Sequence, residues 1–408
     1  MSSLRFQFSI PRYLFGRTIR KLIPSLLWNS GLSCLRYQNM PDPVLPNEEW
    51  LKIKVAYGGI CGSDMNLIYL HDSPSISPFT SFPFTIGHEA VGTVSEVGSK
   101  VAGFGAGDRV VVDPVLSCAA RGMPSPCHAC RRGDYSLCSH ITDGDIAAGL
   151  LIGACRDTGG SWGPYLVAHR SQVLKLPEEV DDLNGVMVEP FSCALHAVMR
   201  NPPGNEDTVL VIGAGTIGIC VVAAIRALDI PCKIVVLSKY ELQTKLALRY
   251  GADEVVRLSR RHETIGEIAA ALKAKVMKPI MGPAVVQGGA DLVFECVGNG
   301  RSIHDALRFA RSGGKVVLLG LAGILDRIDW TTVWLNELDV RGSFAYSTEN
   351  YQGRRMRTLQ IAIELMKLGK VDLAPLITHR FPLANYKAAF TTVANKGRGA
   401  CMKAVFEL

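Results

Sequence analysis

Two groups of side chains in this sequence have the residue types that bind a divalent metal ion. The first is compact: a single loop carries the pattern C-x8-C-x2-C-x7-C, at Cys118, Cys127, Cys130 and Cys138. Four thiolates suit tetrahedral Zn²⁺ in a structural site, and clustered cysteines in a chain of this length favour metal or redox chemistry over a disulfide scaffold. The long first gap makes Cys118 the weakest ligand, with His128 and His140 as substitutes, and a redox C-x-x-C remains an alternative.

The second group is dispersed along the chain. Cys61 stands in GGICGSD, His88 and Glu89 in IGHEAVG, and Glu189 in MVEPFSCALHAV. Taken singly, each has an ordinary interpretation, since a lone cysteine is usually a small buried hydrophobe and a lone histidine or glutamate is usually a surface or structural group. Together they form a mixed thiolate, imidazole and carboxylate set, which is typical of a catalytic zinc site because one position is left to water or substrate.

A third motif predicts a dinucleotide site. The run VLVIGAGTIG follows an apolar strand and opens a helix, which places Gly213, Gly215 and Gly218 in the pattern G-x-G-x-x-G. In this pattern the first glycine makes a tight turn, the second lets the backbone approach a pyrophosphate, and the third allows close packing of helix and strand. The helix N-terminus favours phosphate. The alternative is a Rossmann-type domain that does not bind a cofactor.

The residues after the next predicted strand bear on the choice between NAD and NADP. An acidic residue is expected there to bind the ribose hydroxyls of NAD, but the sequence reads Ser238-Lys239-Tyr240, with Glu241 following. A hydroxyl beside a cation suits a 2′-phosphate, because no carboxylate repels the phosphate and Lys239 can pair with it. We therefore expect NADP(H). The alternative is that Lys239 is a solvated loop charge and that NAD(H) also serves.

The elements that must position these motifs are of two kinds. Residues 32–185 show short strand patterns, as at 51–57, 90–97 and 108–115, between loops rich in Gly and Pro. Within 186–343 strands alternate with helices, at 208–212, 218–227, 233–237, 241–250, 290–296, 302–311 and 315–319. That alternation is typical of a doubly wound parallel sheet. A helix at 358–368 and a strand at 400–406 end the chain, so residues 344–408 are expected to rejoin the first domain.

Length and composition set outer limits. A chain of 408 residues, 48% hydrophobic and 20% charged, is too long for one compact domain and too apolar for disorder. The net charge of +7 is compatible with a phosphorylated cofactor, and no base-reading motif indicates a nucleic-acid partner. We see no secretory signal, and the longest apolar run, 209–225, carries three glycines. A cytoplasmic protein without a membrane partner is therefore expected.

Residues 1–31 form an unusual basic and apolar extension. Within it cations alternate with aliphatic side chains, namely Arg17, Arg20 and Lys21 with Leu14, Ile19, Leu22 and Ile23. The preferred interpretation is packing against the body of the protein. A partner or subunit contact and a membrane-surface helix are the alternatives.

Taken together, these motifs resemble the zinc-containing medium-chain alcohol dehydrogenases, and most closely their sorbitol (polyol) and L-threonine dehydrogenase branch. The resemblance spans roughly residues 32–408 and rests on GGICGSD, GHEAVGTVSEVGSKVAGFGAGDRV, the four-cysteine lobe within 113–140, VEPFSCALHAV and VIGAGTIG. It implies an α/β protein with a GroES-like, mostly β catalytic domain over 32–185 and 344–408. It also implies a Rossmann cofactor domain over 186–343, and a homodimer or homotetramer.

The resemblance further implies site residues, each by its match to a family motif. Two zinc ions per chain are expected: a catalytic one on Cys61, His88, Glu89 and Glu189, and a structural one on the four lobe cysteines. Ser63 matches the hydroxyl of a proton relay. The implied cofactor set is Gly213, Gly215, Thr216, Ile217, Gly218, Ser238, Lys239, Val297, Gly298, Leu319 and Gly320.

Two departures from the family pattern are visible. The first gap among the lobe cysteines is eight residues, where the family usually has two. Asn66 stands where threonine dehydrogenases have a histidine, which counts against threonine as the substrate.

The expected activity is hydride transfer between NAD(P) and a secondary alcohol or polyol, or the matching ketone or aldehyde. Zinc would act as a Lewis acid on the substrate hydroxyl, and Ser63 would carry the released proton. The alternatives are a zinc-free quinone or enone reductase of the same superfamily and a non-catalytic NADPH-binding sensor. Cys61, the His88-Glu89 pair and Glu189 argue against the reductase, because its chemistry needs no thiolate ligand.

Overall fold

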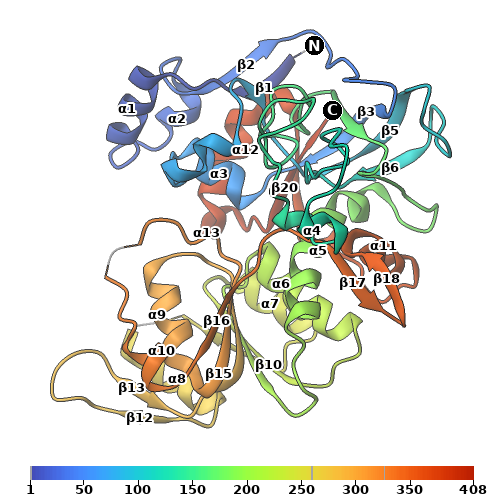
Figure 1. Ribbon diagram of the computed structural model, residues 1–408. Coiled ribbons are helices and arrows are strands. Elements are labelled where there is room, and N and C mark those ends of the chain that lie inside the picture. Colours follow the sequence, from blue (N-terminus) through green and yellow to red (C-terminus); the bar gives the residue numbers. More distant parts are fainter. Residues whose placement is uncertain (1, 259–260, 326) are drawn as a thin grey trace. The chain divides into compact units, whose positions relative to one another are not determined.

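The computed structural model describes residues 2–258, 261–325 and 327–408 (Figure 1). The chain forms two compact units: the first holds the residues up to Glu189 together with Tyr346–Leu408, and the second is Pro190–Ala345. The predicted α/β class, with a mostly β part and a parallel-sheet part, is confirmed. Helix α5 (Asp182–Arg200) runs through the point where the chain passes from the first unit to the second, so the sequence boundary drawn at 185/186 lies inside a helix.

A seven-stranded sheet forms the body of the first unit. Its order is β19-β20-β3-β5-β6-β8, and β7 also pairs with β3. The strands are β3 (Trp50–Gly59), β5 (Ala90–Val97), β6 (Arg109–Val112), β7 (Tyr165–His169), β8 (Val173–Lys175), β19 (Ile377–Pro382) and β20 (Lys403–Glu407). In β3 the alternate residues Leu51, Ile53 and Val55 are buried. This is the period-two pattern of a strand with one face on the core.

The C-terminal strand closes this sheet. β20 pairs antiparallel with β3, so that Val405 lies opposite Gly59. The end of the chain thereby lies beside the segment that follows β3. Between Tyr346 and β20 the first unit also contains β17 (Thr348–Tyr351), β18 (Arg354–Arg357), α11 (Thr358–Lys367), η3 (Ala374–Leu376), η4 (Leu383–Asn385), α12 (Tyr386–Ala394) and α13 (Lys396–Gly399).

The N-terminal extension is folded onto the first unit. Strand β1 (Ser2–Phe6) pairs with β2 (Leu35–Asn39) and β4 (Phe84–Thr85), and α1 (Ile10–Ile19) and α2 (Leu26–Asn29) lie side by side (Figure 1). The side chains of Leu4, Leu27 and Trp28 are buried, and the Trp28 indole N–H donates a 3.3 Å hydrogen bond to Thr391 Oγ1. The inner face of the extension is therefore part of the core of the first unit.

The second unit contains a six-stranded parallel sheet in the order β11-β10-β9-β14-β15-β16. The strands are β9 (Thr208–Ile212), β10 (Lys233–Ser238), β11 (Glu254–Arg257), β14 (Ala290–Glu295), β15 (Ala310–Leu318) and β16 (Asp339–Gly342). The order steps outward through β10 and β11 and then reverses on the other side of β9, as in doubly wound sheets. Ligands bind such sheets outside the carboxyl ends of the strands at this reversal, here between β9 and β14.

Helices and one small hairpin complete the second unit. The helices are α6 (Thr216–Ala227), α7 (Glu241–Arg249), α8 (Arg261–Ala271), α9 (Gly300–Phe309) and α10 (Thr331–Leu335), and β12 (Lys275–Met277) pairs with β13 (Val285–Gln287). The central strands β9, β10 and β14 are buried on both faces, because helices cover a doubly wound sheet from both sides. Within the described ranges of the chain, no helix combines the length and the apolar character needed to cross a bilayer.

Candidate metal and cofactor sites

The structure brings Cys61, His88 and Glu89 together in the first unit. One ligand atom from each, the thiol sulfur, a ring nitrogen and a carboxylate oxygen, lies within 4.8 Å of the others. Cys61 follows β3 and is the N-cap of α3 (Gly62–Ile68), while His88 and Glu89 directly precede β5. Because β3 and β5 pair antiparallel with Gly58 opposite Ala90, the end of one strand meets the start of the other. Sheet register thus joins two motifs that are distant in sequence.

Asp64 supports two of these three residues. Its Oδ2 accepts the Cys61 backbone N–H at 2.9 Å, and its Oδ1 lies 3.4 Å from His88 Nδ1. Burial opposes a charge on His88, but Asp64 and Cys61 together outweigh burial and raise the pKa of His88 well above its ordinary value. A carboxylate on one ring nitrogen orients the other toward a metal. Sequence analysis missed Asp64; its signal was an acid three residues after a helix-capping position.

Glu89 is held by a buried lysine from the C-terminal strand. Lys403 Nζ donates to both carboxylate oxygens of Glu89, at 2.6 Å to Oε1, and to the Ile60 carbonyl at 3.1 Å. Both side chains are buried. A buried carboxylate needs such a partner, because an unpaired charge in the interior is costly. Lys403 was also missed, although a lysine inside the apolar run CMKAVF signals a buried charge.

Glu189 lies near this group without belonging to it. Among the described residues, the set whose ligand atoms lie within 4.8 Å of one another contains Cys61, His88 and Glu89 alone. Glu189 is buried on α5, and its Oε1 accepts a 3.1 Å hydrogen bond from the Tyr346 hydroxyl. Burial raises the pKa of Glu189 to about 7, while His88 lowers it and Glu89 raises it. Ser63 lies half-buried in the first turn of α3, between Cys61 and Asp64.

The chemistry of the donor set fits zinc. Thiolate, imidazole and carboxylate are the three ligand types that Zn²⁺ takes in proteins, and three protein ligands leave a position for water or substrate. The support of His88 by Asp64 is the outer-shell hydrogen bond that metal-binding histidines usually make.

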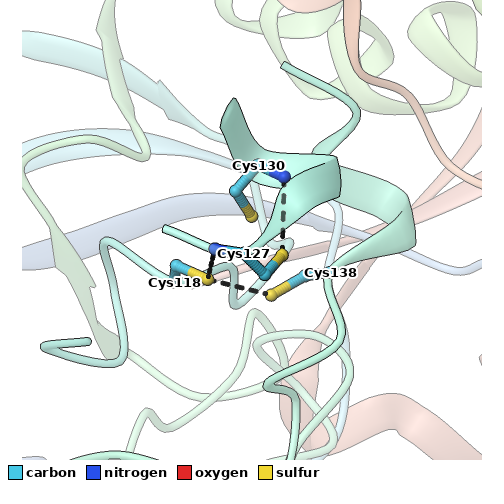
Figure 2. A group of neighbouring side chains, drawn as sticks. All are labelled: Cys118, Cys127, Cys130 and Cys138. Atoms are coloured by element: carbon cyan, nitrogen blue, oxygen red, sulfur yellow. Dashed lines mark hydrogen bonds between the residues drawn. The ribbon is translucent and has the colours of Figure 1, made fainter. Parts of the chain in front are cut away.

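The four lobe cysteines form a second, separate group. Figure 2 shows their side chains pointing toward one another, and their sulfurs lie within 4.8 Å of each other in a buried setting. The sulfurs of Cys118 and Cys138 are 3.5 Å apart, which is too far for a disulfide bond. The backbone N–H of Cys127 donates to Cys118 Sγ at 3.3 Å. Four converging thiols without a bond between them fit a closed zinc site.

The eight-residue gap does not keep Cys118 away from the others. Residues between Cys118 and Cys127 form tight turns, in which Met123 N–H donates to the Cys118 carbonyl at 3.1 Å. Arg121 is fully buried there and donates to the carbonyls of Leu116 at 3.1 Å, Asp143 at 2.9 Å and Gly149 at 2.6 Å. This side chain, which sequence analysis also missed, ties together the backbone segments around the lobe.

The two histidines named as substitute ligands lie differently. His128 is exposed at the start of α4 (His128–Arg131). His140 lies at the edge of the cluster, with Nδ1 3.4 Å from Cys118 Sγ. The described four-residue cluster contains Cys118 and neither histidine.

The glycine motif of the second unit has the geometry that its sequence predicts. Gly213 follows β9 with a φ of +98°, a left-handed conformation that favours glycine, and a Cβ there would overlap Val297. A Cβ on Gly218 would overlap the Gly213 carbonyl, whereas Gly215 has open space around it. Gly213 thus makes the turn, Gly218 allows close packing, and the backbone at Gly215 is open to a ligand. Thr216 begins α6, and Ile217 is its second residue.

Glu295 organises the carboxyl end of the neighbouring strand β14. Its Oε1 accepts the backbone N–H groups of Val297 and Gly298, both at 2.9 Å. Its own backbone carbonyl accepts Leu319 N–H at 2.9 Å and Gly320 N–H at 3.0 Å. The buried Glu295 therefore accepts hydrogen bonds from the backbone of all four residues that the family resemblance implies as nicotinamide contacts. Sequence analysis missed it, although an acid ending the apolar strand LVFE was a signal.

At the end of β10, the two residues assigned to cofactor choice lie in different settings. Ser238 is buried, and its Oγ lies 2.7 Å from Thr244 Oγ1. Lys239 is exposed, with its ammonium 5.4 Å from the centre of the Tyr240 ring. Glu241, the nearest acid in the sequence, pairs with Arg257 at 3.0 Å. At the end of β10, the cation is therefore exposed and the serine hydroxyl is not.

Comparison with known proteins identifies relatives over nearly the whole chain. Residues 47–178 match the alcohol dehydrogenase GroES-like domain, and residues 216–360 match the zinc-binding dehydrogenase domain. L-idonate 5-dehydrogenase of Vitis vinifera is 32% identical over 383 residues, 93% of this chain and 94% of that protein. Sorbitol dehydrogenase of Arabidopsis thaliana is 33% identical over 384 residues, with 93% and 94% covered.

Solved structures share the fold. Galactitol-1-phosphate dehydrogenase from Escherichia coli superposes with a TM-score of 0.72 at 22% identity and covers 100% of both chains. A putative zinc-binding dehydrogenase from Sinorhizobium meliloti, bound to NADP, has a TM-score of 0.68 at 25% identity and covers 92% of this chain and 95% of its own.

Proposed function

The chain belongs to the zinc-containing medium-chain alcohol dehydrogenase family and is an oxidoreductase that uses a nicotinamide cofactor, and we propose that its substrate is a polyol or another secondary alcohol, or the matching ketone. The observation that carries the proposal is that the ligand atoms of Cys61, His88 and Glu89 converge. Asp64 contacts both the Cys61 backbone N–H and the His88 ring. That donor set suits a Lewis-acid zinc ion, which a zinc-free quinone or enone reductase would not need.

The relatives support the substrate class. The L-idonate and sorbitol dehydrogenases each cover more than nine-tenths of the chain at more than 30% identity. An L-threonine 3-dehydrogenase from a Marinomonas species is 30% identical over 345 residues. Asn66, which lies on α3 in the first unit, replaces the histidine of that branch and favours a polyol over threonine.

Each residue near the first site has a proposed task. Zinc, when bound, would supply Lewis acidity that lowers the pKa of a substrate hydroxyl. Cys61, His88 and Glu89 would hold the metal, and Asp64 keeps the imidazole oriented. Lys403 balances the charge of Glu89. Glu189, whose pKa is raised and which accepts a hydrogen bond from Tyr346, offers a further carboxyl group near Cys61, His88 and Glu89. Ser63 would relay the proton that leaves the substrate hydroxyl, accepting it while passing its own hydroxyl proton toward the cofactor ribose and solvent.

The test of the metal assignment is zinc content per chain. We expect two zinc ions in the wild type and one in Cys61→Ala, together with loss of alcohol oxidation, because the lobe site stays intact. Cys34→Ala is the matched control: Cys34 is a buried cysteine of the first unit outside both groups, and the variant should retain two ions. A wild-type content of one or none that Cys61→Ala leaves unchanged would refute the proposal, and quinones and enones would then be the substrates to test.

We also propose that NADP(H) is the preferred cofactor. Lys239 is exposed and positively charged, and the nearest acid, Glu241, is neutralised by Arg257. Lys239→Asp should reverse the preference, because an exposed carboxylate after β10 repels a 2′-phosphate and binds ribose hydroxyls. We expect kcat/KM for NADPH to fall at least about tenfold and that for NADH to rise. Lys239→Gln should lower kcat/KM for NADPH and leave that for NADH unchanged. Equal kcat/KM values for the two cofactors in the wild type would contradict the preference.

Two further proposals concern the cell and the assembly. A reducing, cytoplasmic compartment would suit the thiols of the two metal groups, because both groups need thiolates that are not oxidised to disulfides. We further propose a homo-oligomer built through the second unit. Strand β16 ends the parallel sheet with one free edge, and α10 exposes Trp334 and Leu335. Such edges and apolar patches are usually covered by a partner.

A further inference from the structure

The outer surface of the N-terminal extension has a composition unlike that of the rest of the chain. The first 41 residues contain no acid and six cations, Arg5, Arg12, Arg17, Arg20, Lys21 and Arg36. The rest of the chain holds all 37 acids and is nearly neutral, so this short segment carries almost the whole net charge of +7. A charge of one sign concentrated in one segment attracts an anionic partner.

One stripe of α1 faces away from the core. Gly16 faces inward, where a Cβ would lie close to Leu70 and Leu27. Ile10, Leu14, Arg17 and Lys21 are spaced four, three and four residues apart, so they share one face of the helix. The Ile23 N–H donates to the Ile19 carbonyl, which continues the helical turn beyond the end of α1. We call this face, with Leu22 and Ile23 at its end, the outer stripe.

The outer stripe is apolar and basic where a solvent-facing helix is normally polar and mixed in charge. The exposed fractions are 59% for Leu14, 75% for Leu22 and 50% for Ile23. Among the residues that the structure describes, no carboxylate pairs with Arg17 or Lys21. The stripe therefore offers exposed aliphatic groups and uncompensated positive charge together.

The other cations of the extension add to its positive charge. Burial, and then the neighbouring Arg12 guanidinium, lower the pKa of Arg36. Arg20 donates to the carbonyls of Tyr69 and Leu70, so it neutralises no acid. The fold thus places positive charges near one another, and an external anion would reduce the repulsion between them.

We propose that the outer stripe docks on the anionic lipid surface of a membrane, with Leu14, Leu22 and Ile23 entering the headgroup boundary and Arg17 and Lys21 meeting lipid phosphates. This departs from the expectation of no membrane partner and is independent of the dehydrogenase reaction. A lipid surface is favoured over an acidic protein because the centres of protein interfaces are depleted in charged residues. A bilayer surface instead accepts interspersed cations and aliphatic groups without shape complementarity.

The experiment is sedimentation of the full chain with vesicles. One set contains phosphatidylcholine alone and the other also contains about 30% phosphatidylserine. We expect binding to the anionic vesicles at least about tenfold tighter than to the neutral ones, and weakening by salt. Arg17→Gln with Lys21→Gln should lose about 25-fold, since each cation near an anionic surface contributes about fivefold. Leu14→Ser with Leu22→Ser should also lose binding, because apolar insertion supplies the rest.

The matched control carries the same change of charge elsewhere. Lys54 and Arg354 are exposed cations of the first unit outside the extension, and Lys54→Gln with Arg354→Gln should bind within about twofold of the wild type. Thermal unfolding of each variant shows whether a loss of vesicle binding reflects unfolding of the protein. The variant without the two cations and the variant without the two leucines test the surface independently.

Several results would overturn the proposal. Equal binding to neutral and anionic vesicles would show that charge does not drive the binding. Binding as tight as that of the wild type by both stripe variants would show that the outer stripe is not the docking surface. Binding to polyglutamate without binding to vesicles would point to an acidic protein instead. Self-association that the stripe variants abolish, again without vesicle binding, would point to a second copy of the chain. Alcohol oxidation is measured separately, so failure of docking is distinguishable from failure of the proposed function.

Discussion

At the scale of single residues, the buried pair of Lys403 and Glu89 governs the charge of the first metal group. Burial alone would lower the pKa of Lys403, but Glu89, Cys61 and Glu189 together outweigh burial and raise it. Both Glu89 oxygens accept from this ammonium. The pair therefore supplies a carboxylate to the metal group whose charge is already partly balanced.

Removal of the lysine should be strongly destabilising. Lys403→Met would leave Glu89 buried without a counter-charge, and we expect a loss of about 3–5 kcal/mol in the free energy of unfolding. Chemical denaturation measures it. Lys403→Met combined with Glu89→Gln should recover part of the loss, because the uncompensated charge is removed as well. A loss below about 1 kcal/mol in the single variant would show that the pair contributes little.

At the scale of elements, the four-cysteine lobe shows how a loop closes around an unusual spacing. The turns between Cys118 and Cys127, and the Arg121 side chain that bridges three carbonyls, bring the first cysteine to the other three. The extra length is therefore used in local backbone structure, and the cluster keeps four thiols. His140 is within reach of Cys118 and provides an internal comparison.

The zinc content of lobe variants should show whether Cys118 or His140 is the fourth ligand. Cys118→Ala should reduce zinc to one ion per chain, or raise its release rate to a chelator at least about tenfold, because three thiols leave the closed site incomplete. His140→Ala should retain both ions. The reverse outcome, with zinc lost from His140→Ala and kept by Cys118→Ala, would assign the fourth ligand to histidine.

At the scale of the whole molecule, the second unit carries the surface that we expect to join copies of the chain. The exposed fractions of Trp334 and Leu335 are 69% and 63%, and β16 leaves one sheet edge unpaired within the described chain. Isolated apolar residues are common on protein surfaces, but an open sheet edge and an exposed apolar helix are both features that partners commonly cover.

Sedimentation should show a native mass that is a multiple of 44.2 kDa. Trp334→Glu with Leu335→Ser should weaken association at least about tenfold, since buried aromatic side chains commonly dominate interface energies. Leu137→Ser is the matched control, because Leu137 is similarly exposed, at 62%, in the first unit. A monomeric wild type, or a double variant that associates as the wild type does, would contradict this assembly.

The sequence by itself determined the features that depend on local pattern. Apolar runs between helical segments predicted the parallel sheet, because strands covered on both faces lose alternation. The glycine spacing predicted the Gly213 turn, and the cysteine spacing predicted the lobe, since each of these structures closes over a short stretch of chain.

Only the tertiary structure decided which distant residues meet. Pairing of β3 with β5 joins Cys61 to His88, and pairing of β20 with β3 brings Lys403 across 314 positions to Glu89. Sheet register sets these contacts, and register is settled by packing of the whole face, which no short segment encodes. Helix packing decided the setting of Ser238: its residue type suggested a phosphate contact, but α7 packs against β10, so that its hydroxyl lies by Thr244 while Lys239 is exposed.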